Sequence, residues 1–216
     1  PETVEIKKEC EVKSILVQDG KVLGVEADEI YTSDLVIYTG FATELPKLIK
    51  NLPREYTAHL GGIVHSKSLT IWLGLERELP EFNYTGSEIW FKDFAYWAMP
   101  ISNYDPSLAP KDKQLIGFSF VIDENKSEEH ELKKAYNMIF HAHPKLEKYV
   151  DMQHEQIMIP EKAAVTIDGK FADIRTPVRN LYVAGTDTDK RSMGITRASY
   201  SIIELLKILN EDGNLH

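Results

Sequence analysis

The residues with the clearest chemical potential lie near the C-terminus, where glycines and an acidic residue separate a short apolar run from a long amphipathic one. Residues 181–184 are apolar, Gly185 and Asp187 follow, and the run 196–209 begins shortly after Gly194. We predict a buried strand, a polar loop and a helix that opens at Gly194. The first N–H groups of a helix lack partners and lie at the positive end of its dipole, so this start suits an anionic or electron-rich ligand. The two glycines allow the main chain to approach such a ligand closely.

Other groups of reactive side chains are weaker candidates. His141, His143 and His154 could ligate a metal, but the first two are expected at a helix end and no carboxylate pair accompanies them. Surface histidines are the simpler interpretation. Asp187 and Asp189 could hold a divalent cation, with a solvated loop as the alternative. We therefore predict no metal site.

Composition limits the class of protein. The chain has 216 residues, 43% of them hydrophobic, which suffices for one large domain or two modest ones. Its formal net charge of −9 argues against nucleic acid as a partner. The single cysteine, Cys10, excludes an internal disulfide. No apolar run approaches the roughly 20 residues that span a bilayer, so we expect a cytoplasmic protein, peripheral to a membrane only if its substrate is lipophilic.

The N-terminal segment predicts β-structure. Asp19 and Gly20 separate two apolar runs, which indicates a hairpin because its tight turn needs a positive φ. The run 35–38 is short and rich in β-branched residues, and it ends at Thr39 and Gly40. It predicts a strand buried on both faces, as in a parallel sheet. A short helix is expected over 44–52.

The middle of the chain has a different pattern. Alternating apolar residues over 69–75 and 116–122 predict an antiparallel sheet with one buried face. Ser127 is expected to cap a helix that follows it. A cluster of aromatic residues could line an apolar substrate pocket or fill a core. Its members are Trp90, Phe91, Phe94, Tyr96 and Trp97.

The C-terminal segment returns to the first pattern. The helix after Gly194 is expected to carry one apolar stripe. The residues of that stripe are Ile195, Ala198, Ile202, Leu205, Leu206 and Leu209. The chain is therefore predicted as an α/β piece (1–52), an antiparallel insert (53–159) and a second α/β piece (160–216), with the outer pieces in one domain.

These segments resemble two families of flavoproteins, the FAD-dependent amine oxidases and the phytoene desaturases. The resemblance lies in 11–15, the Asp19–Gly20 turn, 34–40, and the tail 179–187 with the glycine at 194. It covers nearly the whole chain in order and spacing, and the phytoene-desaturase-like branch fits better. It implies an α/β fold in which a partial FAD/NAD(P)-binding, Rossmann-like domain is interrupted by an antiparallel α+β substrate domain.

The resemblance also implies roles for single residues around FAD. The main chain of Val12 would meet the adenine, and Thr39 and Gly40 would flank the path of the adenosine and diphosphate. Gly185 and Asp187 would approach the diphosphate and the ribityl chain, where Asp187 would hydrogen-bond a hydroxyl. The remaining members of the cofactor-binding set are Thr186 between them, and Met193, Gly194 and Ile195 beside the isoalloxazine.

One element of such a site is missing from the sequence. Rossmann-type binding uses a Gly-x-Gly-x-x-Gly turn after the first strand, and no such turn occurs in the 216 residues. We therefore expect the chain alone to bind FAD weakly or not at all. Its expected partner is an N-terminal FAD-binding half or another chain that supplies it.

The resemblance implies a reaction in which FAD takes a hydride from a C–H bond of an apolar or amine substrate. The cofactor carries this chemistry, so no catalytic side chain is nominated. The alternatives are an interaction or storage module without cofactor and a complementing subunit that retains the scaffold. A bare apolar face where the missing half would dock predicts self-association.

Overall fold

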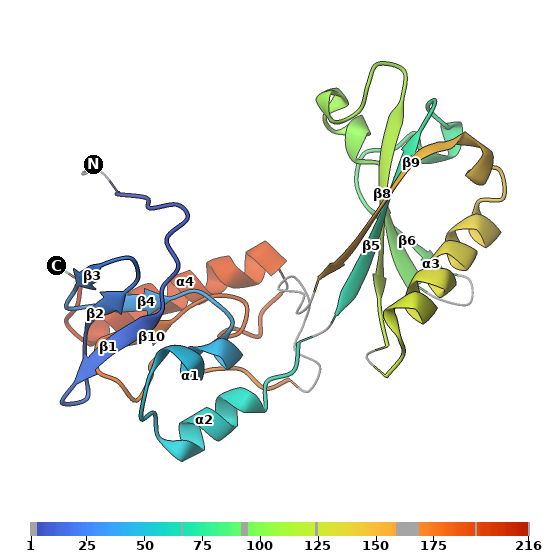
Figure 1. Cartoon of the computed structure of the whole chain (residues 1–216). Helices are drawn as coiled ribbons and strands as arrows, with labels where there is room; N and C mark the ends of the chain where they lie inside the picture. Colours follow the sequence, from blue (N-terminus) through green and yellow to red (C-terminus); the bar gives the residue numbers. More distant parts are fainter. Residues whose placement is uncertain are drawn as a thin grey trace. The chain divides into compact units, whose positions relative to one another are not determined.

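The computed structural model describes residues 4–65, 67–91, 95–123, 125–158, 169–192 and 194–215. The chain folds into two compact units (Figure 1). The first unit comprises Pro1–His65 and Lys162–His216, and the second comprises Ser66–Glu161. Both ends of the chain therefore belong to one unit, with the intervening residues forming the other.

The first unit contains two small sheets. β1 (Ser14–Gln18), β2 (Lys21–Glu26) and β3 (Ile30–Thr32) form an antiparallel sheet in that order. The turn between β1 and β2 is formed by Asp19 and Gly20 at φ values of 51° and 72°, as the sequence predicts. β4 (Val36–Tyr38) and β10 (Leu181–Val183) form a parallel pair. Arg175 forms an antiparallel bridge to Tyr182 of β10.

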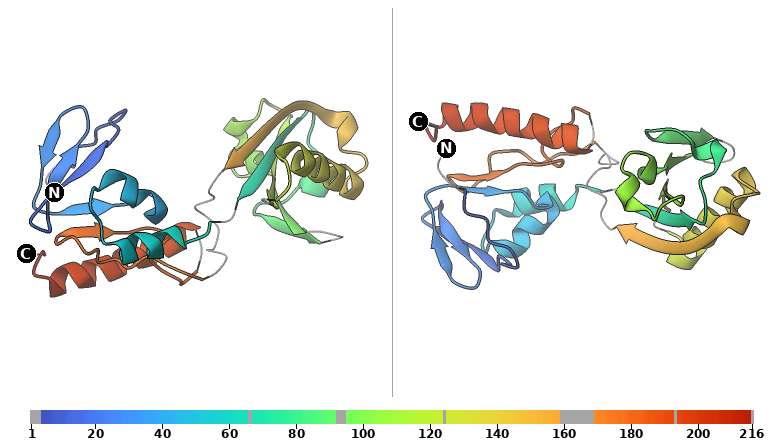
Figure 2. Two further views of the ribbon diagram at one scale, coloured as in Figure 1. Left: turned by 60° about the horizontal axis from the view of Figure 1, so that its bottom comes forward. Right: turned by 90° about the horizontal axis from the view of Figure 1, so that it is seen from above.

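The parallel pair lies between two layers (Figure 2). Side chains alternate along a strand, so Leu181 and Val183 face one layer and Tyr182 and Ala184 the other. The first layer is formed by the β1–β2 hairpin, η1 (Ala42–Glu44), α1 (Leu45–Leu48) and α2 (Arg54–Gly61). The other layer is α4 (Gly194–Glu211), whose Leu205 packs with Tyr182.

The second unit is a five-stranded antiparallel sheet covered on one face by a helix. Its strand order is β6-β7-β8-β5-β9. The strands are β5 (Ser68–Leu75), β6 (Glu88–Phe91), β7 (Ala95–Met99), β8 (Gln114–Val121) and β9 (Val150–Met158). The helix is α3 (Glu128–Ala142), and Ser127 caps it by accepting the N–H of His130. Short 3₁₀ turns occur at η2 (Pro80–Phe82), η3 (Ile101–Asn103), η4 (Pro106–Leu108) and η5 (Glu147–Tyr149).

The core of the second unit follows from the alternation in β5. Every second residue of this strand is buried, and Ile71 lies opposite Phe118 of β8. Ile139 of α3 belongs to the same cluster. The buried face of the sheet is therefore the face that α3 covers, as the alternating pattern predicts.

Some expectations need correction. The helix predicted over 44–52 is shorter, and a second helix, α2, starts just after Pro53. The second unit accordingly begins at Ser66, whereas the sequence placed residues from 53 onward in the insert. β4 is not buried on both faces, because Ile37 is 39% exposed. β9 was not predicted.

The face that α4 buries also differs from the predicted stripe. Its buried residues recur every fourth position: Arg197, Ser201, Leu205 and Leu209. Ile195, Ile202, Ile203 and Leu206 are exposed instead. The helix thus has a second apolar face that remains partly exposed.

Candidate functional site

Two loops meet at the carboxyl edge of the parallel pair. Thr39 and Gly40 follow β4, and Gly185 follows β10, so the two loops leave the sheet at the same edge. The N–H of Ala184 donates to the Tyr38 carbonyl at 2.9 Å. A Cβ added to Gly185 would lie 3.9 Å from the Thr39 carbonyl oxygen. In open α/β sheets this edge is where ligands bind.

Asp187 joins these loops to the rest of the unit. Its Oδ2 accepts the N–H of Ala42 at 2.8 Å, and its Oδ1 lies 2.9 Å from His65 Nε2. Its main-chain oxygen accepts the N–H of Ala172. The side chain is only 5% exposed. In this structure the carboxylate therefore binds groups of the protein itself. Each of its oxygens can accept more than one hydrogen bond, so one further acceptor position remains on each.

The need for glycine at position 40 is explained by a neighbouring side chain. A Cβ at this position would lie 2.3 Å from the hydroxyl of Tyr38, whose ring folds over the glycine. That hydroxyl donates to the carbonyl of Phe41 at 3.1 Å. Burial, then the charges of Glu44 and Asp187, raise the pKa of Tyr38. The glycine is thus required by the tyrosine even without a ligand.

The start of α4 is tied to the loop after β10. Gly194 begins the helix at a φ of 53°, which favours glycine. The Gly185 N–H donates to Ser201 Oγ at 2.9 Å, and Ser201 in turn donates to the Ala198 carbonyl. Ile195 is 87% exposed. Met193 lies outside the described residues.

A charged pair and a buried arginine lie close to this start. Asp189 is buried and accepts hydrogen bonds from the Arg191 side chain, including Nε at 3.0 Å. Those bonds, and the Arg191 main-chain N–H, hold the Asp189 pKa below its usual range despite burial. Arg197 is only 2% exposed and donates through Nε and Nη2 to the Ser192 carbonyl.

Two residues of the predicted set remain, Val12 and Thr186. Val12 is an exposed residue ahead of β1. Thr186 lies beside Asp187, half-buried. The structure therefore gathers Thr39, Gly40 and Gly185 with Thr186 and Asp187.

The aromatic cluster of the second unit separates into two groups. Tyr96 is buried in the core and Trp90 packs against it, whereas Trp97 is exposed. The Phe91 side chain and Phe94 lie outside the described part of the chain. His143 is buried among aromatic rings, at 4.6 Å from Trp90 between centroids.

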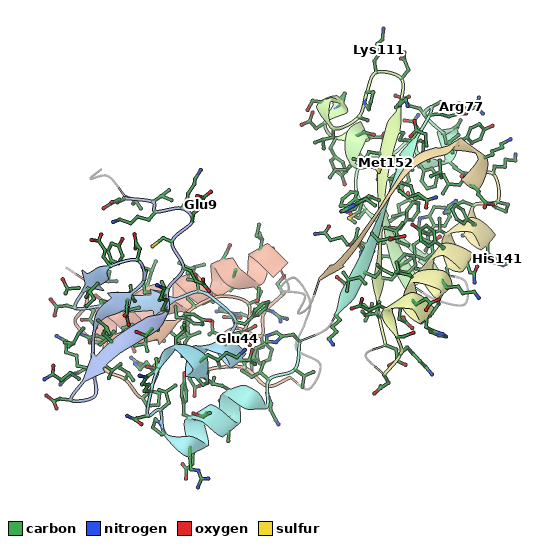
Figure 3. All side chains as sticks on the ribbon, viewed as in Figure 1. Glu9, Glu44, Arg77, Lys111, His141 and Met152 are labelled. Atoms are coloured by element: carbon green, nitrogen blue, oxygen red, sulfur yellow. The ribbon has the colours of Figure 1, made fainter. Side chains whose placement is uncertain are left out.

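No group of three or more His, Cys, Asp or Glu side chains in the described ranges could hold a metal ion. His141 is exposed on α3 (Figure 3). In the same part of the chain, no helix is long and apolar enough to cross a membrane.

Sequence reasoning missed several residues of this site. His65 and Ala42 are far from Asp187 in sequence, so no local pattern links them. Arg197 and Ser201 had a usable signal, because they stand eight and four residues before Leu205, on a single helical row.

Solved structures share the fold of this chain at low sequence identity. No family model matches the sequence, and no curated protein does. An oxidoreductase from Methanosarcina mazei matches 92% of this chain over 49% of its own length, with a TM-score of 0.69 at 20% identity. A protein from Pyrococcus furiosus matches 93% over 46%, with a TM-score of 0.69 at 20% identity. A reduced UDP-galactopyranose mutase matches 73% over 36%, with a TM-score of 0.59 at 15% identity.

The chain spans less than half the length of each of these structures. It shares with them a mixed α/β fold that contains a partial Rossmann-like domain. Because an oxidoreductase and a mutase both have this fold, the fold alone does not select the reaction.

Proposed function

We propose that the chain is the C-terminal portion of an FAD-dependent oxidoreductase, similar to phytoene desaturases and amine oxidases, which dehydrogenates an apolar or amine substrate. The observation that carries the proposal is the meeting of the loops after β4 and β10 at the carboxyl edge of a parallel pair, beside the start of α4. The likeness to an oxidoreductase fold supports it.

The residues at this edge fit a nucleotide cofactor in part. Gly185 at a φ of 138° has open space where a side chain would stand, so a ligand can approach its main chain. The N-terminus of α4 supplies N–H groups for an electron-rich edge. Asp187 fits less simply, because Ala42 and His65 already use its oxygens.

The proposed roles are as follows. FAD, when bound, would supply the hydride-accepting chemistry. Gly185, Thr186 and Asp187 would hold its diphosphate and ribityl groups, with Thr39 and Gly40 beside them. Val12 would meet the adenine, and Met193, Gly194 and Ile195 would flank the ring system. The chain's own contribution is to bind FAD, to orient the substrate against it and to exclude water.

The edge of β4 supports the proposal that a further segment completes the site. The Val36 N–H bonds to the Asn180 carbonyl, and the Tyr38 carbonyl accepts from Ala184. Bonding alternates along a parallel strand, so the N–H and C=O of Ile37 point to the opposite edge. That edge can accept another parallel strand.

We propose that the occupant is a strand, a glycine-rich turn and a helix, from the same protein or from a separate chain. A two-stranded parallel sheet is rarely stable alone, and the chain matches under half of the related structures. The glycine-rich turn would supply the diphosphate cradle that the sequence lacks.

The second unit is proposed as the substrate domain. The sheet face opposite α3 carries a groove without a charged Asp, Glu, Lys or Arg side chain. It is lined by Trp72, Ile101, Leu108, Leu115, Met152, Gln153, His154 and Gln156, with Met152 on β9 (Figure 3). This lining suits an apolar substrate.

Flavin titration with and without the complement tests the proposal. We expect the purified chain to carry no stoichiometric flavin, and the chain co-expressed with a strand–glycine turn–helix segment to bind one FAD. Ile195→Glu should weaken this binding, because it puts a negative charge at the start of α4 without burying it. Asn210→Glu, near the other end of the helix, is the matched control.

Failure of the complemented protein to bind FAD would overturn the proposal and favour a cofactor-free interaction module. The encoding DNA upstream of the first residue distinguishes the two sources of the complement. An in-frame strand–glycine turn–helix there indicates one protein, and its absence with a nearby start codon indicates a complementing subunit.

A further inference from the structure

Arg197 is a buried cation with an incomplete set of partners. Its Nε and Nη2 share the Ser192 carbonyl, with Nε at 3.0 Å. Nη1 is shielded from solvent and has no hydrogen-bond partner. The guanidinium carbon lies 5.4 Å from the centre of the Phe171 ring, a contact that offers no acceptor atom for Nη1.

The charge of Arg197 is also uncompensated by an ion pair. The carboxylate whose pKa its charge lowers is Asp189, but Asp189 is already bonded to Arg191 through both oxygens. No ion pair of Arg197 occurs among the described residues. A buried cation is costly unless an anion or a full set of acceptors compensates it.

The position of this guanidinium adds a second feature. Ser192 stands two residues before the first residue of α4, so the Arg197 side chain folds back toward the start of its own helix. The first N–H groups of an α-helix are unpaired there and the dipole is positive. The unpaired cation and the helix start thus favour the same kind of ligand.

We infer that Arg197 and the first turn of α4 form an anion-binding site. The ligand is an oxyanion, or the anionic edge of a larger ligand such as the proposed flavin. A ligand must displace the groups that shield Nη1, so equilibrium measurements after long incubation are required. The inference concerns the anion and holds whether or not FAD is the cofactor.

Thermal unfolding of the chain in sodium sulfate, against sodium chloride at equal ionic strength, tests this site. In the low millimolar range, where the general stabilising effect of sulfate is small, sulfate should raise the Tm of the wild type by about 3 °C beyond chloride at roughly ten times its Kd. Arg197→Met is close in shape and uncharged, so it should lose this extra rise and be no less stable than the wild type without sulfate. Lys207→Met, which removes an exposed charge near the other end of α4, should keep the rise.

Arg197→Lys distinguishes a lost anion site from a folding defect in Arg197→Met. It keeps the positive charge, so it should keep part of the sulfate response. A response that persists in Arg197→Met, or that is absent from the wild type, would overturn the inference. Lower stability of Arg197→Met together with no wild-type response would identify Arg197 as a structural donor to Ser192 only.

A second experiment distinguishes a free oxyanion from the edge of a bound flavin. In the complemented protein loaded with FAD, Arg197→Met should lower the flavin reduction potential if the flavin edge is the ligand, because a nearby cation favours the reduced, more negative form. An unchanged potential with a lost sulfate response assigns the site to a free oxyanion. If no FAD binds, the proposed function fails while the sulfate experiment still decides the anion site.

Discussion

Asp187 Oδ1 lies 2.9 Å from His65 Nε2, while its Oδ2 accepts the Ala42 N–H at 2.8 Å. These partners precede Asp187 by 122 and 145 residues. One carboxylate therefore holds the loop after β10 against the start of η1 and the segment after α2. The geometry of the candidate site depends on this connection as much as on its glycines.

Removing this carboxylate should destabilise the chain. Asp187→Ala leaves the buried Ala42 N–H and His65 unpaired, so we expect a loss of about 2–4 kcal/mol in the free energy of unfolding. Asp187→Asn keeps one acceptor and should cost less. Urea unfolding measures both.

A double-mutant cycle with His65→Ala isolates the pair, with an expected coupling of about 1–3 kcal/mol. Asp34→Ala is the matched control, because its side chain is 96% exposed and pairs with Lys21 at the surface. It should change stability by less than about 0.5 kcal/mol. Additive effects of the Asp187 and His65 substitutions would contradict the connection.

A glycine of the second unit makes room for an indole ring. A Cβ at Gly117 would lie 2.7 Å from Trp72, whose ring crosses from β5 over β8 and whose Nε1 donates to Gln156 of β9. Gly117→Ala should therefore cost about 1–3 kcal/mol and change the tryptophan fluorescence. Gly61→Ala meets no atom within 4 Å and should be neutral or slightly stabilising. Equal effects of the two substitutions would show that the ring moves freely.

Acid should weaken the first unit through Asp189. The Arg191 hydrogen bonds hold the Asp189 pKa below its usual range, so the folded state favours the ionised carboxylate. Its stabilisation is complete above the ordinary aspartate pKa near 3.9 and is lost as pH falls through the lower, folded-state pKa.

Asp189→Asn should thus be less stable than the wild type by about 1–3 kcal/mol at pH 7, with the difference shrinking below about pH 3.9. Urea unfolding at several pH values measures it. A difference that stays constant down to pH 3 would assign the effect to lost packing instead of charge.

Local chemistry made part of the fold predictable. The turn at Asp19 and Gly20 needs positive φ, and the Ser127 cap needs a side-chain acceptor, so both are visible in a few residues. The alternation of β5 is equally local, because one face of its sheet is buried. These features required no knowledge of distant residues.

The rest depends on contacts between distant segments. β9 is largely exposed, and its strand structure comes from pairing with β5, which lies about 80 residues earlier. The partners of Asp187 are equally remote. In α4 an apolar pattern with two faces hid the buried row, which contains Arg197 and Ser201. Hydrophobicity alone favoured the face with Ile195, Ile202 and Leu206, which is exposed.

That exposed face of α4 gives the last prediction. Ile202, Ile203 and Leu206 stand together on the helix, and bare apolar patches of this kind commonly mark interaction sites. Without its proposed complement the chain should self-associate as its concentration rises. The double substitution Ile202→Lys with Leu206→Lys should shift it toward the monomer without unfolding it, because both side chains are already exposed.

Light scattering after size exclusion, over a range of concentrations, measures this association. Thr57→Lys adds a positive charge at an exposed position of α2, away from the patch, and should leave the association unchanged. A wild-type chain that remains strictly monomeric at high concentration would show that the face does not bind a second copy.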